Sequence, residues 1–158
     1  MRESNRPAEI LLVEDNPGDV ELVHEALQFG KVLNRISVVT DGEAALAFLN
    51  RANGFENAPR PDVILLDLNI PKKSGFDVLK EVKGHRDLSN VPVVILTSSQ
   101  ADRDILKSYD LRANCFISKP LDVDEFLATV RSTGEFWLSL VRLPPGDRPS
   151  QQNLPPAP

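Results

Sequence analysis

The 158-residue sequence carries 23 acidic and 18 basic side chains, a formal net charge of -5, and 41% hydrophobic residues. This balance argues against a nucleic-acid partner, because nucleic-acid-binding domains concentrate Lys and Arg on one face. No apolar run approaches the roughly 20 residues of a membrane-spanning helix, and the single Cys115 cannot form an internal disulfide. We therefore expect a cytoplasmic protein with no nucleic-acid and no membrane partner.

Short apolar, β-branched runs alternate along the chain with segments of helical periodicity. The predicted strands are 10–13, 36–39, 63–66, 91–96 and 115–117, and the predicted helices are 19–29, 43–50, 75–83, 102–111 and 122–141. Such alternation requires right-handed crossovers, which place helices on both faces of a parallel sheet. The run 36–39 is less continuously apolar than the first, third and fourth runs, so it suits a strand at the edge of the sheet. The pattern predicts an α/β fold: a doubly wound, flavodoxin-like five-stranded parallel sheet of order 2-1-3-4-5 with five helices.

Helix-capping residues and proline-rich composition divide the chain into one domain and two terminal segments. Asn16-Pro17 is typical of a helix start, since the Asn side chain can cap and the proline lacks an N-H that would go unused. We expect a flexible N-terminus over residues 1–7 and a single domain over residues 8–143 with an extended last helix. The proline-rich composition of residues 144–158 cannot form a core, so we expect a disordered tail there.

Polar residues stand where four of the predicted strands end. Glu14-Asp15 follows the first strand, Asp67 the third, Thr97 the fourth and Lys119 the fifth. The carboxyl ends of parallel strands meet in one crevice, so we expect these side chains to converge there.

Oxygen ligands at this crevice suit Mg²⁺, which takes one or two carboxylates and keeps several waters. We expect Asp15 and Asp67 as direct ligands, Glu14 through a water, and the backbone carbonyl of Asn69 as a further oxygen. Mg²⁺ and Lys119 would offset the charge of a phosphoryl group moving onto Asp67, the nucleophile, to form an acyl phosphate. An acidic pair such as Glu14-Asp15, taken alone, is usually just a solvated strand end; the strand-end Asp67 favours a functional role for it.

Other polar residues have simpler explanations that stay open. Thr97 with Ser98 and Ser99 can cap the following helix, bind a phosphoryl group, or do both. Lys119-Pro120 is compatible with an ordinary turn. His24, His85 and Cys115 lack metal-site spacing, and we assign them to packing or to the surface.

Several of these segments together resemble the receiver domain of two-component response regulators. They are Ile10-Leu11-Leu12-Val13-Glu14-Asp15-Asn16, Leu65-Leu66-Asp67-Leu68-Asn69-Ile70-Pro71, Gly75, Leu96-Thr97-Ser98 and Ser118-Lys119-Pro120. The resemblance covers residues 8–141. It implies phosphorylation of Asp67 by a sensor histidine kinase, Mg²⁺ held by the residues named above, and a phosphoryl group bound by Thr97 and Lys119. It further implies that Phe116 is a switch aromatic, although the residues alone favour ordinary packing of Phe116 in an edge strand.

A narrower resemblance is to single-domain regulators of bacterial and cyanobacterial phytochromes. It is carried by Asn16-Pro17-Gly18-Asp19-Val20, Pro71-Lys72-Lys73-Ser74-Gly75, residues 108–116 and Phe136-Trp137-Leu138. This resemblance implies a red/far-red photoreceptor as the kinase.

Output is expected through protein contacts, since only the proline-rich segment follows residue 143. The predicted surface is formed by the fourth helix, fifth strand and fifth helix. Its apolar candidates are Ile105, Tyr109, Phe136, Trp137, Leu140 and Val141. These side chains could form a homodimer interface, which we favour, or cover the domain's own core.

Two other classes of protein compete with this interpretation. A haloacid-dehalogenase-like phosphohydrolase also uses a strand-end Asp, a hydroxyl, a Lys and Mg²⁺, but it usually has a second Asp where this chain has Asn69. A phosphate-independent dimeric adaptor could use the same fold. We expect no enzyme activity beyond the protein's own phosphorylation and dephosphorylation.

Overall fold

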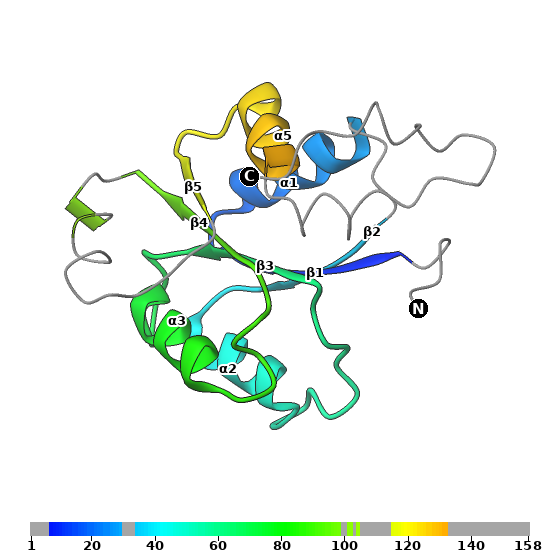
Figure 1. Cartoon of the computed structure of the whole chain (residues 1–158), viewed down its shortest axis with the longest axis vertical. Helices are drawn as coiled ribbons and strands as arrows, with labels where there is room; N and C mark the ends of the chain where they lie inside the picture. Colours follow the sequence, from blue (N-terminus) through cyan, green and yellow to red (C-terminus); the bar gives the residue numbers. More distant parts are fainter. Residues whose placement is uncertain (1–6, 30–33, 99–100, 103, 105–114, 133–158) are drawn as a thin grey trace.

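The computed structural model describes residues 7–29, 34–98, 101–102, 104 and 115–132. Its strands form one parallel sheet of order β2-β1-β3-β4-β5, which confirms the predicted topology (Figure 1). The elements in chain order are β1 (Ala8–Val13), α1 (Pro17–Phe29), β2 (Asn34–Val39), α2 (Gly42–Asn50), β3 (Val63–Asp67), α3 (Gly75–Gly84), β4 (Val93–Thr97), β5 (Cys115–Ser118) and α5 (Val123–Ser132).

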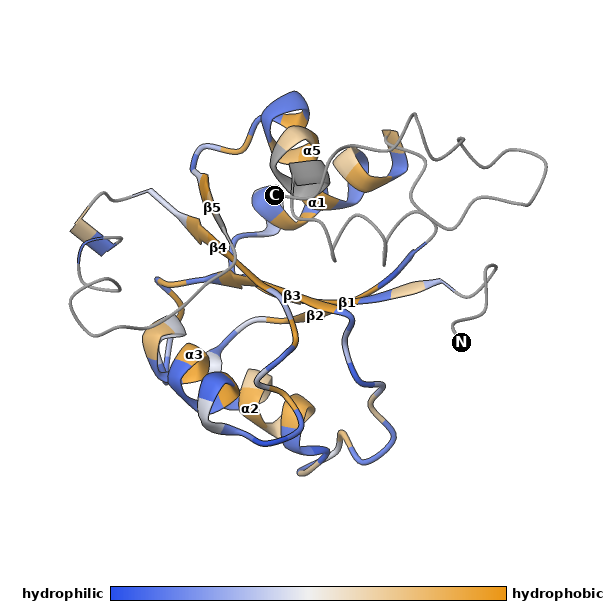
Figure 2. Cartoon of the chain, in the orientation of Figure 1, coloured by the Kyte–Doolittle hydropathy of each residue, from blue (hydrophilic) through white to orange (hydrophobic). Residues whose placement is uncertain are grey.

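The sheet separates two hydrophobic layers. Alternate side chains of β1, Leu11 and Val13 on one face and Ile10 and Leu12 on the other, enter different core clusters. Helices α2 and α3 cover the first face, and α1 and α5 cover the second, as Figure 1 shows. In Figure 2 the sheet is the most hydrophobic part of the molecule and the helices present hydrophilic residues outward. The central strands β1, β3 and β4 are therefore buried throughout, whereas β2 at the edge is partly exposed.

Capping side chains fix where three helices begin. Asn16 Oδ1 accepts a hydrogen bond from Asp19 N at 3.1 Å at the start of α1, as its sequence predicts. Asp41 caps α2 through Ala44 N, and the Ser74 hydroxyl caps α3 through the backbone N-H of Asp77. Each cap satisfies a backbone N-H that the helix itself leaves without a partner.

One strand begins later than predicted, and several predicted segments fall outside the described residues. Val91 N donates to Leu88 O at 2.9 Å, so Val91 belongs to a turn and β4 begins at Val93. Of the predicted helix 102–111, only residues 102 and 104 are described, and both are helical. Residues 1–6, the predicted extension of α5 beyond Ser132, and the tail 144–158 lie outside the described part.

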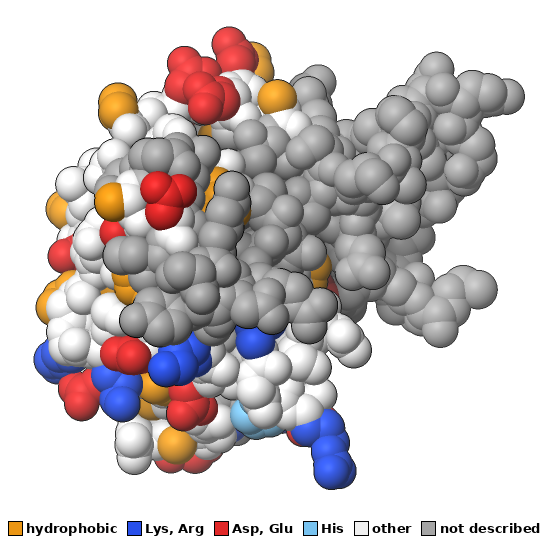
Figure 3. All heavy atoms as spheres, turned by 60° about the vertical axis from the view of Figure 1, so that its left-hand side comes forward, with side chains coloured by type: hydrophobic (Ala, Val, Ile, Leu, Met, Phe, Trp, Pro, Cys, Tyr) orange, Lys and Arg blue, Asp and Glu red, His pale blue; other side chains and the backbone are white. Residues whose placement is uncertain are grey.

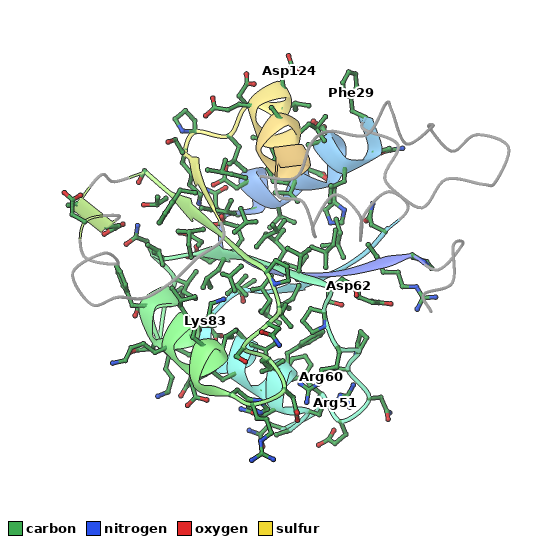
Figure 4. The ribbon with its side chains drawn as sticks, in the orientation of Figure 1. Phe29, Arg51, Arg60, Asp62, Lys83 and Asp124 are labelled. Carbon is green, nitrogen blue, oxygen red and sulfur yellow. The ribbon has the colours of Figure 1, made fainter. Side chains whose placement is uncertain are left out.

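The long loop between α2 and β3 is tied back onto α2. Arg60 Nη1 donates to Leu49 O at 2.6 Å and Arg51 Nε donates to Ala58 O at 2.9 Å, so the two guanidinium groups lie near the end of α2 (Figure 4). Phe48 and Phe55 pack with ring centroids 5.6 Å apart. The loop lies at the end of the sheet where β3 begins, away from the site at its carboxyl ends.

The outer face of α3 is charged. Asp77, Lys80 and Glu81 are exposed there. Figure 3 shows acidic and basic side chains interspersed over the lower part of the molecule. Among the described helices, none combines the length and apolar character that a membrane span requires.

Candidate functional site

Glu14 and Asp15 leave the buried strand β1 in opposite environments. Glu14 is completely buried and Asp15 is exposed, in keeping with the alternation of side chains at a strand end. Glu14 N donates to Val39 O at 3.0 Å, which fixes this turn to β2. Glu14 Oε2 accepts from Asn16 N at 3.2 Å. The fixed backbone therefore brings one carboxylate inside the protein and leaves its neighbour open to a ligand.

Asp67 is the last residue of β3 and is 3% exposed. Its Oδ1 accepts from Asn69 N at 2.9 Å, and its Oδ2 accepts from Lys119 Nζ at 3.0 Å. The chain after Asp67 lies against the start of α3, where Gly75 N donates to Leu68 O at 3.1 Å. A Cβ at Gly75 would lie 2.5 Å from Asp67 O and from Leu68 Cα, so only glycine allows this approach without a backbone shift.

Three carboxylates converge at this edge of the sheet. Oxygen atoms of Glu14, Asp15 and Asp67 all lie within 4.8 Å of one another. At that spacing the charges repel by several kcal/mol at an effective dielectric of about 20. A hard divalent cation relieves such repulsion and prefers these oxygen ligands. The donor set therefore fits Mg²⁺, and the three residues are those that the sequence predicts.

Lys119 partly neutralises the cluster. Its Nζ lies 2.7 Å from Glu14 Oε1, 2.9 Å from Asp19 Oδ2 and 3.0 Å from Asp67 Oδ2, and its side chain is 16% exposed. Burial on its own would lower the pKa of Lys119, but the contacts with Asp19, Glu14 and Asp67 raise it above its ordinary value. The ammonium group stays protonated and is directed into the crevice from a Lys119-Pro120 peptide that is cis.

Glu14 is the carboxylate least compensated by its surroundings. Burial raises its pKa from 4.5 to about 7; contact with Lys119 opposes the rise and Asp67 adds to it. Oε1 is buried and meets Lys119 as an ion pair, but among the described residues no donor directs a hydrogen bond at it. A buried acceptor without a directed donor is what an added cation or its bound water would satisfy.

Thr97 ends β4 and its hydroxyl is engaged by another acidic residue. Thr97 Oγ1 donates to Asp102 Oδ2 at 3.1 Å. Asn69 Nδ2 donates to the same oxygen at 3.4 Å. The backbone of β4 and β5 is joined beside the site by Lys119 N, which donates to Thr97 O at 2.9 Å.

Phe116 lies in β5 opposite Ile95 and is half-buried against the core cluster shared with α2 and α3. The predicted interface residues lie outside the described part of the chain: Ile105, Tyr109, Phe136, Trp137, Leu140 and Val141.

Asp19 and Asp102 belong to the site although the sequence does not single them out for it. Asp19 lies in the first turn of α1 and Asp102 in the short helical segment after β4. An acidic residue in a first helical turn is usually explained by its favourable interaction with the helix dipole. The sequence alone therefore does not distinguish such a residue from a member of the site. For Asp19, the proximity of the predicted strand-end carboxylates was the available clue.

Comparison with known proteins identifies the class to which this arrangement belongs. Residues 10–131 match the family model of the response regulator receiver domain. The chain is a member of this family.

Three relatives show similarity over most of the chain. Response regulator Rcp1 from Synechocystis sp. is 44% identical over 142 residues, covering 90% of this chain and 97% of Rcp1. The bacteriophytochrome response regulator RtBRR has a structure with a TM-score of 0.78 and 43% identity, covering 89% of this chain and 86% of that one. The phosphorylated cyanobacterial phytochrome response regulator RcpA has a TM-score of 0.72 and 44% identity, covering 85% and 96%.

The comparisons also bear on the metal. Rcp1 has been solved in a Mn²⁺-bound form, which has a TM-score of 0.72 and 43% identity and covers 87% of this chain and 99% of Rcp1. Receiver domains bind a divalent metal, and this chain has the three-carboxylate cluster for one. The predicted use of a divalent cation is thereby confirmed for the class.

Proposed function

We propose that Asp67 accepts a phosphoryl group from a phosphohistidine of a sensor histidine kinase. The observation that carries this proposal is the Asp67 carboxylate, buried at a strand end, 3.0 Å from Lys119 Nζ and clustered with Glu14 and Asp15. In the transfer, a carboxylate oxygen of Asp67 attacks phosphorus and forms the new P-O bond. The P-N bond breaks, and its electron pair returns to the imidazole of the kinase.

The chain's own residues position the reactants. Asn69 N holds one oxygen of Asp67 and Lys119 holds the other, so the carboxylate is oriented before the donor arrives. Asp15, Asp67 and the Asn69 carbonyl would hold Mg²⁺, with Glu14 acting through a bound water. When bound, Mg²⁺ neutralises charge on the transferring phosphoryl oxygens.

After transfer, Lys119 and the Thr97 hydroxyl bind the new phosphoryl group. Phosphorylation adds about 1.5 to 2 negative charges and three strong acceptors. The group shifts the conformational equilibrium only by interacting more strongly with one arrangement of these residues than with the other. We propose that Phe116, half-buried in β5, changes its packing as Thr97 moves.

A phytochrome is our proposed kinase, and protein contacts are the proposed output. The named relatives RtBRR and RcpA support a phytochrome partner because each is a phytochrome response regulator and is 43% or 44% identical. We further propose that residues 8–143 form the receiver domain and that the chain acts in the cytoplasm without nucleic-acid or membrane contact. It would form a homodimer through the fourth helix, fifth strand and fifth helix.

The deciding experiment is intact-mass analysis after incubation with Mg²⁺ and acetyl phosphate, with Asp67→Asn as the matched variant. We expect a hydroxylamine-labile phosphoryl adduct on the wild type and none on the variant. Light scattering on the same samples tests whether the assembly mass changes with the adduct.

Other outcomes distinguish the competing functions. Equal absence of the adduct in both proteins, with Mg²⁺ bound, would favour a phosphate-independent adaptor. Steady turnover of an added phosphate ester would favour a phosphohydrolase. Dimerisation that is unchanged by Asp67→Asn would separate assembly from phosphorylation.

A further inference from the structure

Two side chains of the site, those of Thr97 and Asn69, donate hydrogen bonds to the same carboxylate oxygen. Asp102 Oδ2 accepts from Thr97 Oγ1 at 3.1 Å and from Asn69 Nδ2 at 3.4 Å. Asp102 is half-buried and follows β4 in sequence, whereas Asn69 follows β3. A single carboxylate therefore bridges the ends of the two strands that carry the acceptor Asp67 and the hydroxyl Thr97.

The bridge restricts the hydroxyl. A threonine hydroxyl has one proton, so while Thr97 donates to Asp102 it cannot donate to a phosphoryl group on Asp67. A hydrogen bond to a carboxylate is about twice as strong as one between neutral groups, which makes Asp102 an effective competitor. The Asn69 amide strengthens the contact because its donation helps to keep Asp102 in place.

We propose that Asp102 is a positioning residue that holds the Thr97 hydroxyl in the unphosphorylated state and thereby sets the threshold of the switch. This inference rests on the proposed phosphorylation of Asp67. The phosphoryl group and Asp102 are both anions, so they repel each other and compete for the one proton of the Thr97 hydroxyl. The phosphoryl group has more charge and Lys119 beside it, so it takes the hydroxyl and Asp102 is released.

The hydrogen bond from Thr97 to Asp102 must break before the hydroxyl can bind the phosphoryl group. Its free energy therefore opposes phosphorylation. Removing the carboxylate should therefore favour the phosphorylated arrangement without adding any contact to it. Beryllofluoride with Mg²⁺, a mimic of the phosphoryl group, measures this bias as a dissociation constant at equilibrium. For Asp102→Ala we expect beryllofluoride to bind on the order of tenfold more tightly, the effect of one hydrogen bond to a charged group.

Three variants make the test specific. Asp102→Asn keeps an acceptor but removes the charge, and we expect an intermediate gain. Asp104→Asn makes the same charge change at an exposed position two residues away, and we expect affinity within about twofold of wild type. In a Thr97→Val background, Asp102→Ala should have no further effect, because Asp102 acts through the hydroxyl.

A second readout needs no phosphoryl group. The methyl resonance of Thr97 in phosphate-free protein should shift in Asp102→Ala and stay in place in Asp104→Asn, since only the former removes the carboxylate to which the Thr97 hydroxyl donates. A purely structural role for Asp102 would alter the unfolding midpoint but would leave the affinity gain independent of Thr97.

The outcomes separate this inference from the function beneath it. Wild-type protein that binds beryllofluoride and takes phosphate from acetyl phosphate, with Asp102→Ala unchanged in both affinity and the Thr97 resonance, would overturn the inference alone. The inference also fails if Asp104→Asn gains as much affinity, or if the gain persists in Thr97→Val. Wild type that takes neither reagent would overturn the proposed function and the switch role of Asp102 together.

Discussion

The two halves of the site are held by different means. In the acceptor half, Glu14, Asp15 and Asp67 lie at the ends of central strands, and Gly75 lets α3 approach the backbone of Asp67. In the switch half, contacts with carboxylates hold the side-chain hydroxyl of Thr97 and the ammonium group of Lys119. Backbone packing cannot be exchanged for another arrangement at low cost, but a polar side-chain contact can. The acceptor is therefore fixed, and the contacts around it are the movable part.

Removing the Lys119 ammonium group should reduce stability most, because Glu14, Asp19 and Asp67 then lose the cation that they contact. For Lys119→Met in EDTA we expect the free energy of unfolding to fall by roughly 3 to 5 kcal/mol, as when one partner of a buried ion pair is removed. Mg²⁺ should restore part of the loss, since it compensates the same charges. Urea unfolding with and without Mg²⁺ measures both effects. Lys80→Met, the same change on the exposed face of α3, should alter stability little.

Glu14 makes the stability of the metal-free protein depend on pH. Its folded pKa of about 7 lies above the ordinary 4.5, so between these values the native state binds more protons than the unfolded state. The contribution of Glu14 to the free energy of unfolding is therefore full below pH 4.5, falls as the pH rises to about 7, and is lost above that. The total loss is on the order of 3 kcal/mol.

Urea unfolding in EDTA across that pH range tests the assignment to Glu14. The Glu14→Gln variant, which cannot ionise, should lose this pH dependence. A wild-type profile that stays level between about pH 5 and about 7 would show that Glu14 ionises as in water. Mg²⁺ favours the ionised carboxylates, so its affinity should increase over the same range.

A matched pair of glycines in α3 tests the rigidity of the acceptor half. Gly75→Ala would place a methyl group 2.5 Å from Asp67 O, so the backbone must shift; we expect a loss of roughly 1 to 3 kcal/mol and slower phosphorylation. Gly84→Ala meets no atom within 4 Å and should raise stability by about 0.5 to 1 kcal/mol. Urea unfolding and the rate of adduct formation measure the two effects. Equal behaviour of the variants would refute the role of close packing at Gly75.

The sequence predicted the acceptor half more completely than the switch half, for a physical reason. Asp67 and Thr97 end apolar strands, and the strand period together with parallel topology is enough to place them at one edge. Asp19 and Asp102 lie beyond the strands, where the direction of a side chain depends on the backbone path of a loop or first helical turn. Hydrophobic periodicity contains no information about that path. Their contacts with Lys119 and Thr97 therefore emerged only from the structure.

The smallest of the expected losses of stability should come from removing the cap that starts α3. Ser74→Ala removes the acceptor for Asp77 N, and we expect a loss of about 1 kcal/mol. Because Ser74 precedes Gly75, this change weakens the helix without placing an atom against Asp67. Adduct formation should stay near the wild-type rate while the urea midpoint decreases. If phosphorylation slows as much as in Gly75→Ala, the acceptor half depends on the stability of α3 as a whole rather than on close approach at one glycine.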